Sequence, residues 1–437
     1  MAVQRQVQVP GRRIGILAAQ FLLTTCLLAC TGEPPSIEYI SDARARTYHF
    51  VNGNWFDGEG FVSRAFYVVD GMLTSQEPVT IDAVVDLRAG FVVPPFGEAH
   101  QHNVDADNGM LEELNASYLQ AGVFYVKNPN TLPRTLPATL AIVKRPTTID
   151  AVFSGGGVTV TDGHPKGVAQ RNVDRGYWTT ADVDGGFIYE VDDAAELEAR
   201  WREIATASRD FVKTYLLYSE EYAERADSAD AQYWKGLDPE LLPRLVELAH
   251  RDGLRVATHV ESAADFRAAV NAGVDEINHT PGFRRGGPEP DQGYAQACTL
   301  TRADADLAAA AGTTVVTTSS GWLLRGVVKR NLEHLRDAGV TIVVGTDSYE
   351  AAPTEEIEWL QSSGIFSNAQ LLTMWAVDTP RSIFPDRAIA RLADSFEASF
   401  IVLDGNPLED FDYVRDIRLG VKQGRIILRR VEPDSPI

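Results

Sequence analysis

Cysteine is scarce in this sequence, which has only three cysteines among its 437 residues. Two of them, Cys26 and Cys30, fall in an amino-terminal segment, so Cys298 is the single thiol in the rest of the chain. An internal disulfide is therefore excluded there. The letters around Cys298, QACTLTR, include no histidine partner, which makes a packed thiol a better interpretation than a nucleophile.

Positive charge is also in short supply. Lysine and arginine total 40 against 61 aspartate and glutamate, and the formal net charge is -21. A polyanion such as nucleic acid would be repelled over most of the surface, so nucleic-acid binding is not expected. The hydrophobic content of 44% is enough for a large core in one big domain or two smaller ones, and disorder is not indicated.

The first thirty residues contain little charge, because three arginines are their only charged side chains. A mostly apolar run follows these arginines, as in an export signal. Its end, LLAC, resembles a bacterial lipobox, which implies a lipoprotein signal peptide at 1–30 and lipidation of Cys30. The body would then be tethered by lipid in the envelope of a Gram-negative bacterium, at the outer membrane or facing the periplasm. An uncleaved membrane-spanning anchor is the alternative.

The rest of the chain divides into segments that differ in the spacing of their apolar residues. Residues 31–44 contain a proline-bearing polar spacer and are interpreted as a linker. Short apolar segments with turns at 45–90 and again at 388–430 predict a small β domain, a β-sandwich built from both ends of the mature chain. Between them, residues 91–387 alternate apolar strands with helical stretches. Eight such units favour an α/β TIM (β/α)8 barrel over an open parallel sheet, although the pattern alone fits both.

Polar residues stand where these predicted strands end. A His-x-His pair ends the first strand, and its alternate residues place both imidazoles on one face. Alone, such a histidine is more often a packed, hydrogen-bonded residue than a ligand. Six residues at strand ends favour a metal site instead, because catalytic groups of a barrel lie at the carboxyl ends of its strands. These residues are His100, His102, Lys213, His259, His279 and Asp347.

The order HxH, K, H, H, D resembles the amidohydrolase superfamily, in its imidazolonepropionase-like and prolidase-like branch of two-metal hydrolases. The likeness extends over about 45–430, because FIVLDGNPLED is similar to the small β domain of that family. The resemblance implies that His100, His102, Lys213 and Asp347 hold one metal ion. It implies that Lys213, as a carbamate bridging both ions, holds the second together with His259 and His279.

Carboxylation has a physical reason, since an ammonium would repel a divalent cation whereas a carbamate offers two anionic oxygens. Imidazoles combined with oxygen donors suit zinc, with manganese and iron as alternatives. The resemblance implies a bridging hydroxide as nucleophile, with Asp347 accepting its proton and passing it to the leaving group.

Two further motifs are candidates for substrate contacts. TVTDGHP resembles a threonine-glycine-glycine-histidine segment of the family, which would place His164 at the pocket mouth, although Asp162 departs from that pattern. His164 would contact a substrate carbonyl or stabilise negative charge, or else cap a loop. Tyr218 follows the Lys213 strand and is a candidate substrate contact, with amphipathic packing as the alternative. The basic loop beginning at Arg284 would meet a substrate carboxylate, or be a solvated turn.

The expected function is hydrolysis of a carbon–nitrogen bond in a small amide, dipeptide or cyclic amide. Ester, lactone or organophosphate hydrolysis is the alternative within enzymes, because one metal-bound hydroxide attacks all these electrophiles. An inactive surface binding lipoprotein is the alternative outside enzymes. The expected partners are a small-molecule substrate and the membrane, reached through the lipid anchor, and a homo-oligomer is compatible with the sequence.

Overall fold

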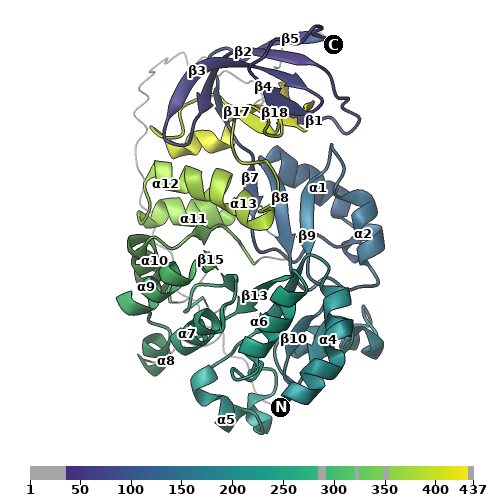
Figure 1. Cartoon of the computed structure of the whole chain (residues 1–437), viewed down its shortest axis with the longest axis vertical. Coiled ribbons are helices and arrows are strands. Elements are labelled where there is room, and N and C mark those ends of the chain that lie inside the picture. Colours follow the sequence, from purple (N-terminus) through teal and green to yellow (C-terminus); the bar gives the residue numbers. More distant parts are fainter. Residues whose placement is uncertain (1–35, 284–291, 320–323, 348–353, 432–437) are drawn as a thin grey trace, which may run out of the picture.

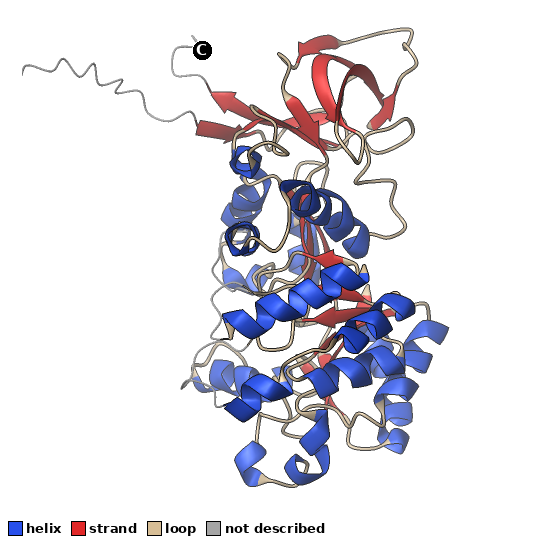
Figure 2. Ribbon diagram, turned by 90° about the vertical axis from the view of Figure 1, so that its left-hand side faces the viewer, coloured by secondary structure: helices blue, strands red, loops and turns tan. Residues whose placement is uncertain are grey.

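The computed structural model describes residues 36–283, 292–319, 324–347 and 354–431. The expected signal peptide and Cys30 lie outside these residues. The chain has an α/β fold, with a mixed sheet at one end of the molecule and strands covered by helices in the remainder (Figures 1 and 2). None of the helices formed by the described residues combines the length and the apolarity that a bilayer crossing requires.

The mixed sheet joins both ends of the described chain. Its order is β1-β19-β18-β17-β6-β2-β3-β4, with β5 paired to β2. Neighbours are antiparallel except for the parallel pairs β2–β5 and β2–β6. Its strands are β1 (Ser36–Tyr39), β2 (Tyr48–Phe56), β3 (Phe61–Val69), β4 (Met72–Thr74), β5 (Ala83–Asp86), β6 (Phe91–Val93), β17 (Phe400–Leu403), β18 (Ile417–Lys422) and β19 (Arg425–Val431).

Aromatic side chains hold the two ends of the chain together in this sheet. Along β2 buried residues alternate with more exposed ones, as expected of a strand with one face on a core. Phe50 and Trp55 on β2 pack edge-on against Phe400 of β17, with ring centroids 5.0 and 5.1 Å apart. The structure also differs from the expected boundaries, since β1 lies in the segment interpreted as a linker and β6 in the segment assigned to the barrel.

The second part of the fold consists of parallel strands, as the alternating pattern predicts. One sheet has the order β7-β8-β9 and the other β11-β10-β12-β13-β14-β15-β16. All their pairs are parallel. The strands are β7 (Phe96–Glu98), β8 (Val123–Asn128), β9 (Asp150–Phe153), β10 (Gly157–Thr159), β11 (Ile188–Glu190), β12 (Phe211–Tyr215), β13 (Arg255–His259), β14 (Glu276–Asn278), β15 (Thr314–Val316) and β16 (Ile342–Val343).

Helices follow most of these strands and cover the parallel sheets (Figure 1). Local signals set their ends: α7 starts at a capping box on Ser262 and stops at Gly273, whose φ of 81° is left-handed. The helices are α1 (Leu111–Gln120), α2 (Leu136–Ile142), α3 (Lys166–Asp174), α4 (Ala194–Ser208), α5 (Tyr222–Arg225), α6 (Leu242–Arg251), α7 (Ala263–Ala272), α8 (Gln292–Ala297), α9 (Arg302–Ala311), α10 (Arg325–Ala338), α11 (Glu355–Ser363), α12 (Asn368–Thr373) and α13 (Thr379–Ile383).

The first and last parallel strands lie beside each other at their carboxyl ends. The backbone N–H of Ala99 donates to the carbonyl of Val344 at 2.8 Å, and that of Asp347 donates to the carbonyl of His100 at 2.8 Å. These bonds join the chain that leaves β7 to the chain that leaves β16. Residues separated by almost 250 positions, His100 and Asp347, are thereby brought side by side.

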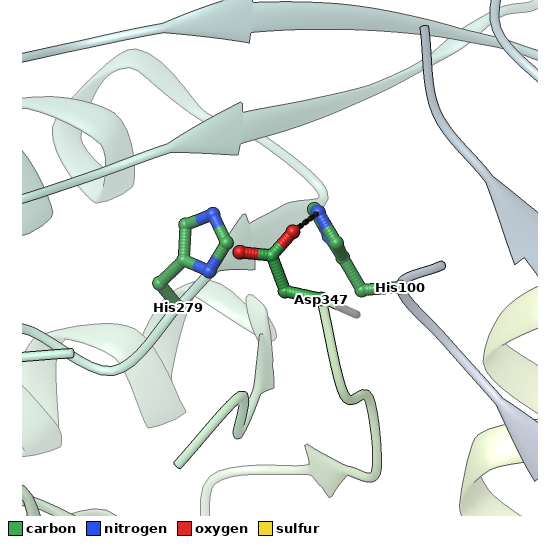
Figure 3. A group of neighbouring side chains, drawn as sticks. All are labelled: His100, His279 and Asp347. Atoms are coloured by element: carbon green, nitrogen blue, oxygen red, sulfur yellow. Dashed lines mark ion pairs between the residues drawn. The ribbon is translucent and has the colours of Figure 1, made fainter. Parts of the chain in front are cut away.

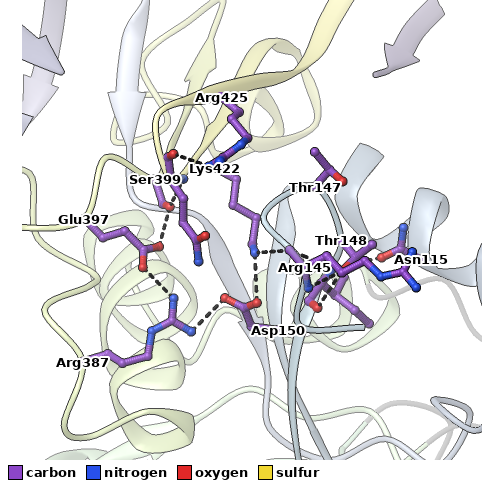
Figure 4. Close-up of polar contacts among 12 residues, drawn as sticks. Asn115, Arg145, Thr147, Thr148, Asp150, Arg387, Glu397, Ser399, Lys422 and Arg425 are labelled. Atoms are coloured by element: carbon purple, nitrogen blue, oxygen red, sulfur yellow. Dashed lines mark hydrogen bonds and ion pairs between the residues drawn. The ribbon is translucent and has the colours of Figure 1, made fainter. Parts of the chain in front are cut away.

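A buried ionic group connects the parallel strands to the mixed sheet (Figure 4). Lys422 of β18 donates to Asp150 of β9 at 2.9 Å, and Arg387 donates to the other oxygen of that carboxylate at 2.8 Å. Arg387 also donates to Glu397 at 2.6 Å. We call these four residues the junction network. Every charged group in it faces an opposite charge, as buried ions require.

Candidate metal centre

The structure brings the six strand-end residues into one cavity. His100 and His102 follow β7, Lys213 lies in β12, and His259 is the last residue of β13. His279 follows β14 and Asp347 follows β16. All six line a cavity of about 320 Å³, which we call the metal cavity. Parallel strands present their carboxyl ends at a single edge, and this explains the convergence.

Three of these residues have side-chain atoms at the spacing that one metal ion demands. Nε2 of His100 and Nε2 of His102 are 3.2 Å apart, and Oδ1 of Asp347 lies 3.5 and 3.2 Å from them. Ligands at about 2.1 Å from a tetrahedral zinc ion are roughly 3.4 Å from one another. His279 lies on the other side of the Asp347 carboxylate, and ligand atoms of His100, His279 and Asp347 all fall within 4.8 Å of one another (Figure 3).

Hydrogen bonds of the outer nitrogen orient two of these rings, those of His102 and His279. Nδ1 of His102 lies 3.2 Å from the carbonyl oxygen of Pro129, which can only accept, so Nδ1 is the donor and Nε2 is the atom that faces Asp347. Nδ1 of His279 likewise lies 2.8 Å from the Thr318 hydroxyl. Such outer contacts are typical of metal-binding histidines. A cation between the lone pair of His102 and the carboxylate would remove their repulsion.

Burial keeps most of the histidines of the cavity neutral. It lowers the pKa of His100, His164, His259 and His279 well below the usual value, because a buried imidazolium loses its hydration. Neighbouring cationic groups lower these pKa values further. A neutral imidazole is the form that binds metal, so the protonation state suits ligation.

Lys213 is the one lysine among the described residues that line the cavity, and it is fully buried. Burial lowers the pKa of its amine to about 7, so a large share is neutral near neutral pH. Its Nζ donates to the side-chain oxygen of Asn278, whose own amide donates to Glu276 at 2.8 Å. The neighbour of Lys213 is therefore a neutral amide. By comparison, another buried lysine, Lys127, donates directly to Glu276 at 2.8 Å.

Two acidic residues of the site escaped the sequence analysis. Glu261 lines the metal cavity, and its Oε1 lies 3.3 Å from Nε2 of His259. The signal for it is present in the sequence, because Glu261 follows His259 at the same i, i+2 spacing as the His-x-His pair. Glu98 accepts the backbone N–H groups of His100 and Thr346, each at 2.9 Å, and so ties both ligand-bearing segments together. Burial raises its pKa to about 8.

The other residues that the sequence analysis singled out do not all lie in the metal cavity. His164 lines the metal cavity, with its ring 4.8 Å from that of His259 and 5.3 Å from that of Tyr215. Tyr218 is not part of the described lining, and its ring lies 3.9 Å from the guanidinium carbon of Arg225. Cys298 is buried, in agreement with a packed thiol, and burial raises its pKa to about 12. The loop beginning at Arg284 lies outside the described residues.

An α/β fold with imidazoles and a carboxylate converging at the carboxyl ends of parallel strands defines a class of proteins with a candidate metal centre at that edge. The chain belongs to the amidohydrolase family, whose model matches residues 187–427. This confirms the family, and with it the amidohydrolase enzyme class, that the sequence motifs predicted. His100, His102 and His164 lie before the matched range.

Several known hydrolases are similar to this chain in sequence or in fold. An ochratoxinase of Aspergillus niger is 27% identical over 177 residues, which are 39% of this chain and 37% of that protein. The match thus spans little more than a third of the length of this relative. The crystal structure of A. niger ochratoxinase superimposes with a TM-score of 0.66 at 18% identity, covering 89% of this chain and 97% of that one. A prolidase complexed with N-methylphosphonate-L-proline gives 0.67 at 16% identity over 88% and 100%, and molinate hydrolase gives 0.67 at 15% over 90% and 97%.

Proposed function

We propose that this protein is a metal-dependent hydrolase that cleaves a carbon–nitrogen bond in a small amide, dipeptide or cyclic amide. The observation that carries the proposal is the triangle formed by His100 Nε2, His102 Nε2 and Asp347 Oδ1, with sides of 3.2 to 3.5 Å. Amide substrates are favoured over esters by membership of the amidohydrolase family and by the names of similar proteins, among them ochratoxinase, prolidase and molinate hydrolase.

The donor set fits two divalent ions, for which zinc is the first choice. His100, His102, Lys213 and Asp347 would hold one ion, and Lys213, His259 and His279 the other. When bound, the ions would supply a water of lowered pKa as a bridging hydroxide and polarise the carbonyl of the substrate. Both roles depend on neutral imidazoles, which burial favours for three of the four histidines, His100, His259 and His279.

Lys213 would join both ions as a carbamate. The lone pair of the neutral amine attacks the carbon of carbon dioxide, a C–N bond forms, one C–O π bond opens, and the amine proton leaves to water. A pKa of about 7 makes the neutral amine available for this step. The product carries two anionic oxygens in place of a cation, which suits a site filled with metal.

Two side chains would handle protons and charge during turnover. Asp347, at the edge of the cavity and 19% exposed, would take a proton from the attacking water and deliver it to the leaving nitrogen. His164, which lines the cavity beside His259, would donate a hydrogen bond to the substrate carbonyl as negative charge develops. Tyr218 remains a candidate substrate contact only if its ring leaves Arg225.

We propose further that the parallel strands close into a (β/α)8 barrel. Eight positions would be filled by β7, β8, the interrupted pair β9 and β10, β12, β13, β14, β15 and β16. The backbone hydrogen bonds from Ala99 to Val344 and from Asp347 to His100 support closure between the first and the last strand. The mixed sheet would then form the small β domain, packed in the manner of a sandwich, that brackets the barrel at 45–90 and 388–430.

A hydrolysis screen of the purified full-length protein tests the proposed reaction. Dipeptides, N-acyl amino acids, lactones and aryl phosphotriesters are compared, with and without added zinc. We expect turnover of amides that is lost after chelation and restored by metal. Turnover of lactones or phosphotriesters alone would contradict amide hydrolysis and favour the alternative, ester-type hydrolysis. Amide turnover that resists chelation would contradict the metal mechanism.

For localisation, we propose that the chain is exported and held in the bacterial envelope through lipid on Cys30. The LLAC ending of the apolar segment supports this proposal. A Cys30→Ser variant should lose palmitate labelling and move from the membrane fraction to the soluble fraction. Unchanged labelling would contradict it.

A further inference from the structure

A second cavity of about 820 Å³ lies directly beside the metal cavity. Four residues line both cavities: His102, Asn130, Val168 and Phe187. The two spaces therefore meet across these side chains, one of which is a proposed metal ligand. We call the second space the side cavity. When the scissile bond of a substrate lies at the metal centre, a substituent on one side of that bond can extend into the side cavity.

Aromatic rings form one wall of the side cavity. Tyr177 lines it and is 70% exposed, so its ring is open to an approaching group. Trp178 also lines the cavity, and its ring is held 4.8 Å from that of Phe187. Together these rings offer an apolar surface on which a flat group can stack.

The charged residues of the side cavity offer no unpaired cation to an anionic group. Its lining includes Asp105, Asp107 and Arg134. Arg134 is already engaged by two carboxylates, at 2.8 Å from Asp107 and 2.7 Å from Asp182. Among the described lining residues the one guanidinium is thus already paired, and the other polar groups are mostly neutral amides, so this lining favours an uncharged group over a carboxylate or phosphate.

We infer that the substrate carries a bulky, uncharged aromatic substituent on one side of the scissile amide, and that the side cavity binds it. This inference rests on the proposed amide hydrolysis at the metal centre and narrows its substrate class from small dipeptides to aryl-substituted amides. The side cavity has more than twice the volume of the metal cavity, so it has room for a larger group than the one held at the ions.

Two series of matched amides test the inference with the full-length holoenzyme. In one series the acyl half changes from acetyl to benzoyl to 2-naphthoyl on alanine, and in the other the amine half changes from methyl to phenyl to 2-naphthyl. We expect kcat/KM to rise by about 10- to 100-fold from the smallest to the largest member of one series, mainly through KM, because stacking buries a large apolar area.

Variants of the wall identify the cavity as the source of that preference. Tyr177→Ser removes one ring of the wall, and Asn172→Phe, at another residue that lines the side cavity, fills the space. Each should lower the naphthyl-to-methyl ratio at least about threefold. Tyr413→Ser, which changes a half-exposed tyrosine of the distant small domain, should keep the ratio. Equal turnover along both series, or an unchanged ratio in both wall variants, would overturn the inference. Absence of turnover for every amide would instead reject the proposed function itself.

Discussion

The junction network and the histidine-lined metal centre are both buried and polar, yet their atoms are arranged in opposite ways. In the junction network each ion faces an opposite charge, as Lys422 and Arg387 do on the two oxygens of Asp150. At the metal centre, electron-rich atoms face one another, since two imidazole nitrogens and a carboxylate oxygen lie within 3.5 Å. A complete set of pairs is typical of a structural role, and a set of converging donors is typical of a cation-binding site.

The two buried lysines that contact β14 repeat this contrast on a smaller scale. Lys127 pairs with Glu276 and is held as a structural cation. Lys213 meets Asn278, two residues further along the same strand face, and has an amide where Lys127 has a carboxylate. An aspartate at position 278 would oppose a carbamate, because two anions would then be in contact. On the proposed mechanism, this difference of one side chain would separate a lysine that stabilises the fold, Lys127, from a lysine that is carboxylated, Lys213.

The largest expected effect comes from breaking the metal centre. Asp347→Asn should lower kcat by about 100- to 10,000-fold, because it removes the group proposed to move the proton and weakens one ligand. The free energy of unfolding should change little, since Asp347 is not part of a paired network. Steady-state kinetics and urea unfolding, measured on the same preparation, test the expected loss of kcat and the expected constancy of the free energy of unfolding. A variant with full activity would remove Asp347 from the mechanism.

Breaking the junction network should instead lower the free energy of unfolding and leave the metal centre unchanged. Lys422→Met leaves Asp150 with only Arg387 and should cost about 3 kcal/mol of unfolding free energy, because a buried carboxylate loses a partner. Metal content and KM should stay as in the parent. Arg302→Gln serves as the matched control, since its ion pair with Asp306 is exposed and should be worth under about 1 kcal/mol. Equal losses in urea unfolding for both variants would contradict a structural role for the network.

The smallest effect is expected at Asn278, which lies between Lys213 and Glu276, the partner of Lys127. Asn278→Leu should weaken binding of the second ion by about 10- to 100-fold, as is common when a residue that orients a ligand is lost. It should also reduce the carbamate signal in NMR spectra recorded with 13C-labelled bicarbonate. Lys213→Ala abolishes that signal and provides the control, and adding Asn278→Leu to it should then change metal affinity no further. A full carbamate signal in Asn278→Leu would show that Lys213 does not depend on this amide.

Much of this account could be predicted from the sequence, because its signals are local. The HxH, K, H, H, D order and apolar strand runs predicted the family and the parallel α/β fold, and both are confirmed. Contacts between distant segments could not be read in this way. Glu98, the junction network and the side cavity depend on how β7, β9 and the loops after β8 and β10 meet in space. Strand β1 was missed because its four residues pair with β19, almost 400 positions away.

The central claim is that the converging donors hold two metal ions, and the metal content of the purified protein tests it most directly. Elemental analysis of the native full-length chain, paired with activity on the same sample, should find close to two divalent ions per chain. The second ion should be absent from Lys213→Ala. Full amide-hydrolase activity in a preparation with far less than one ion per chain would contradict the account.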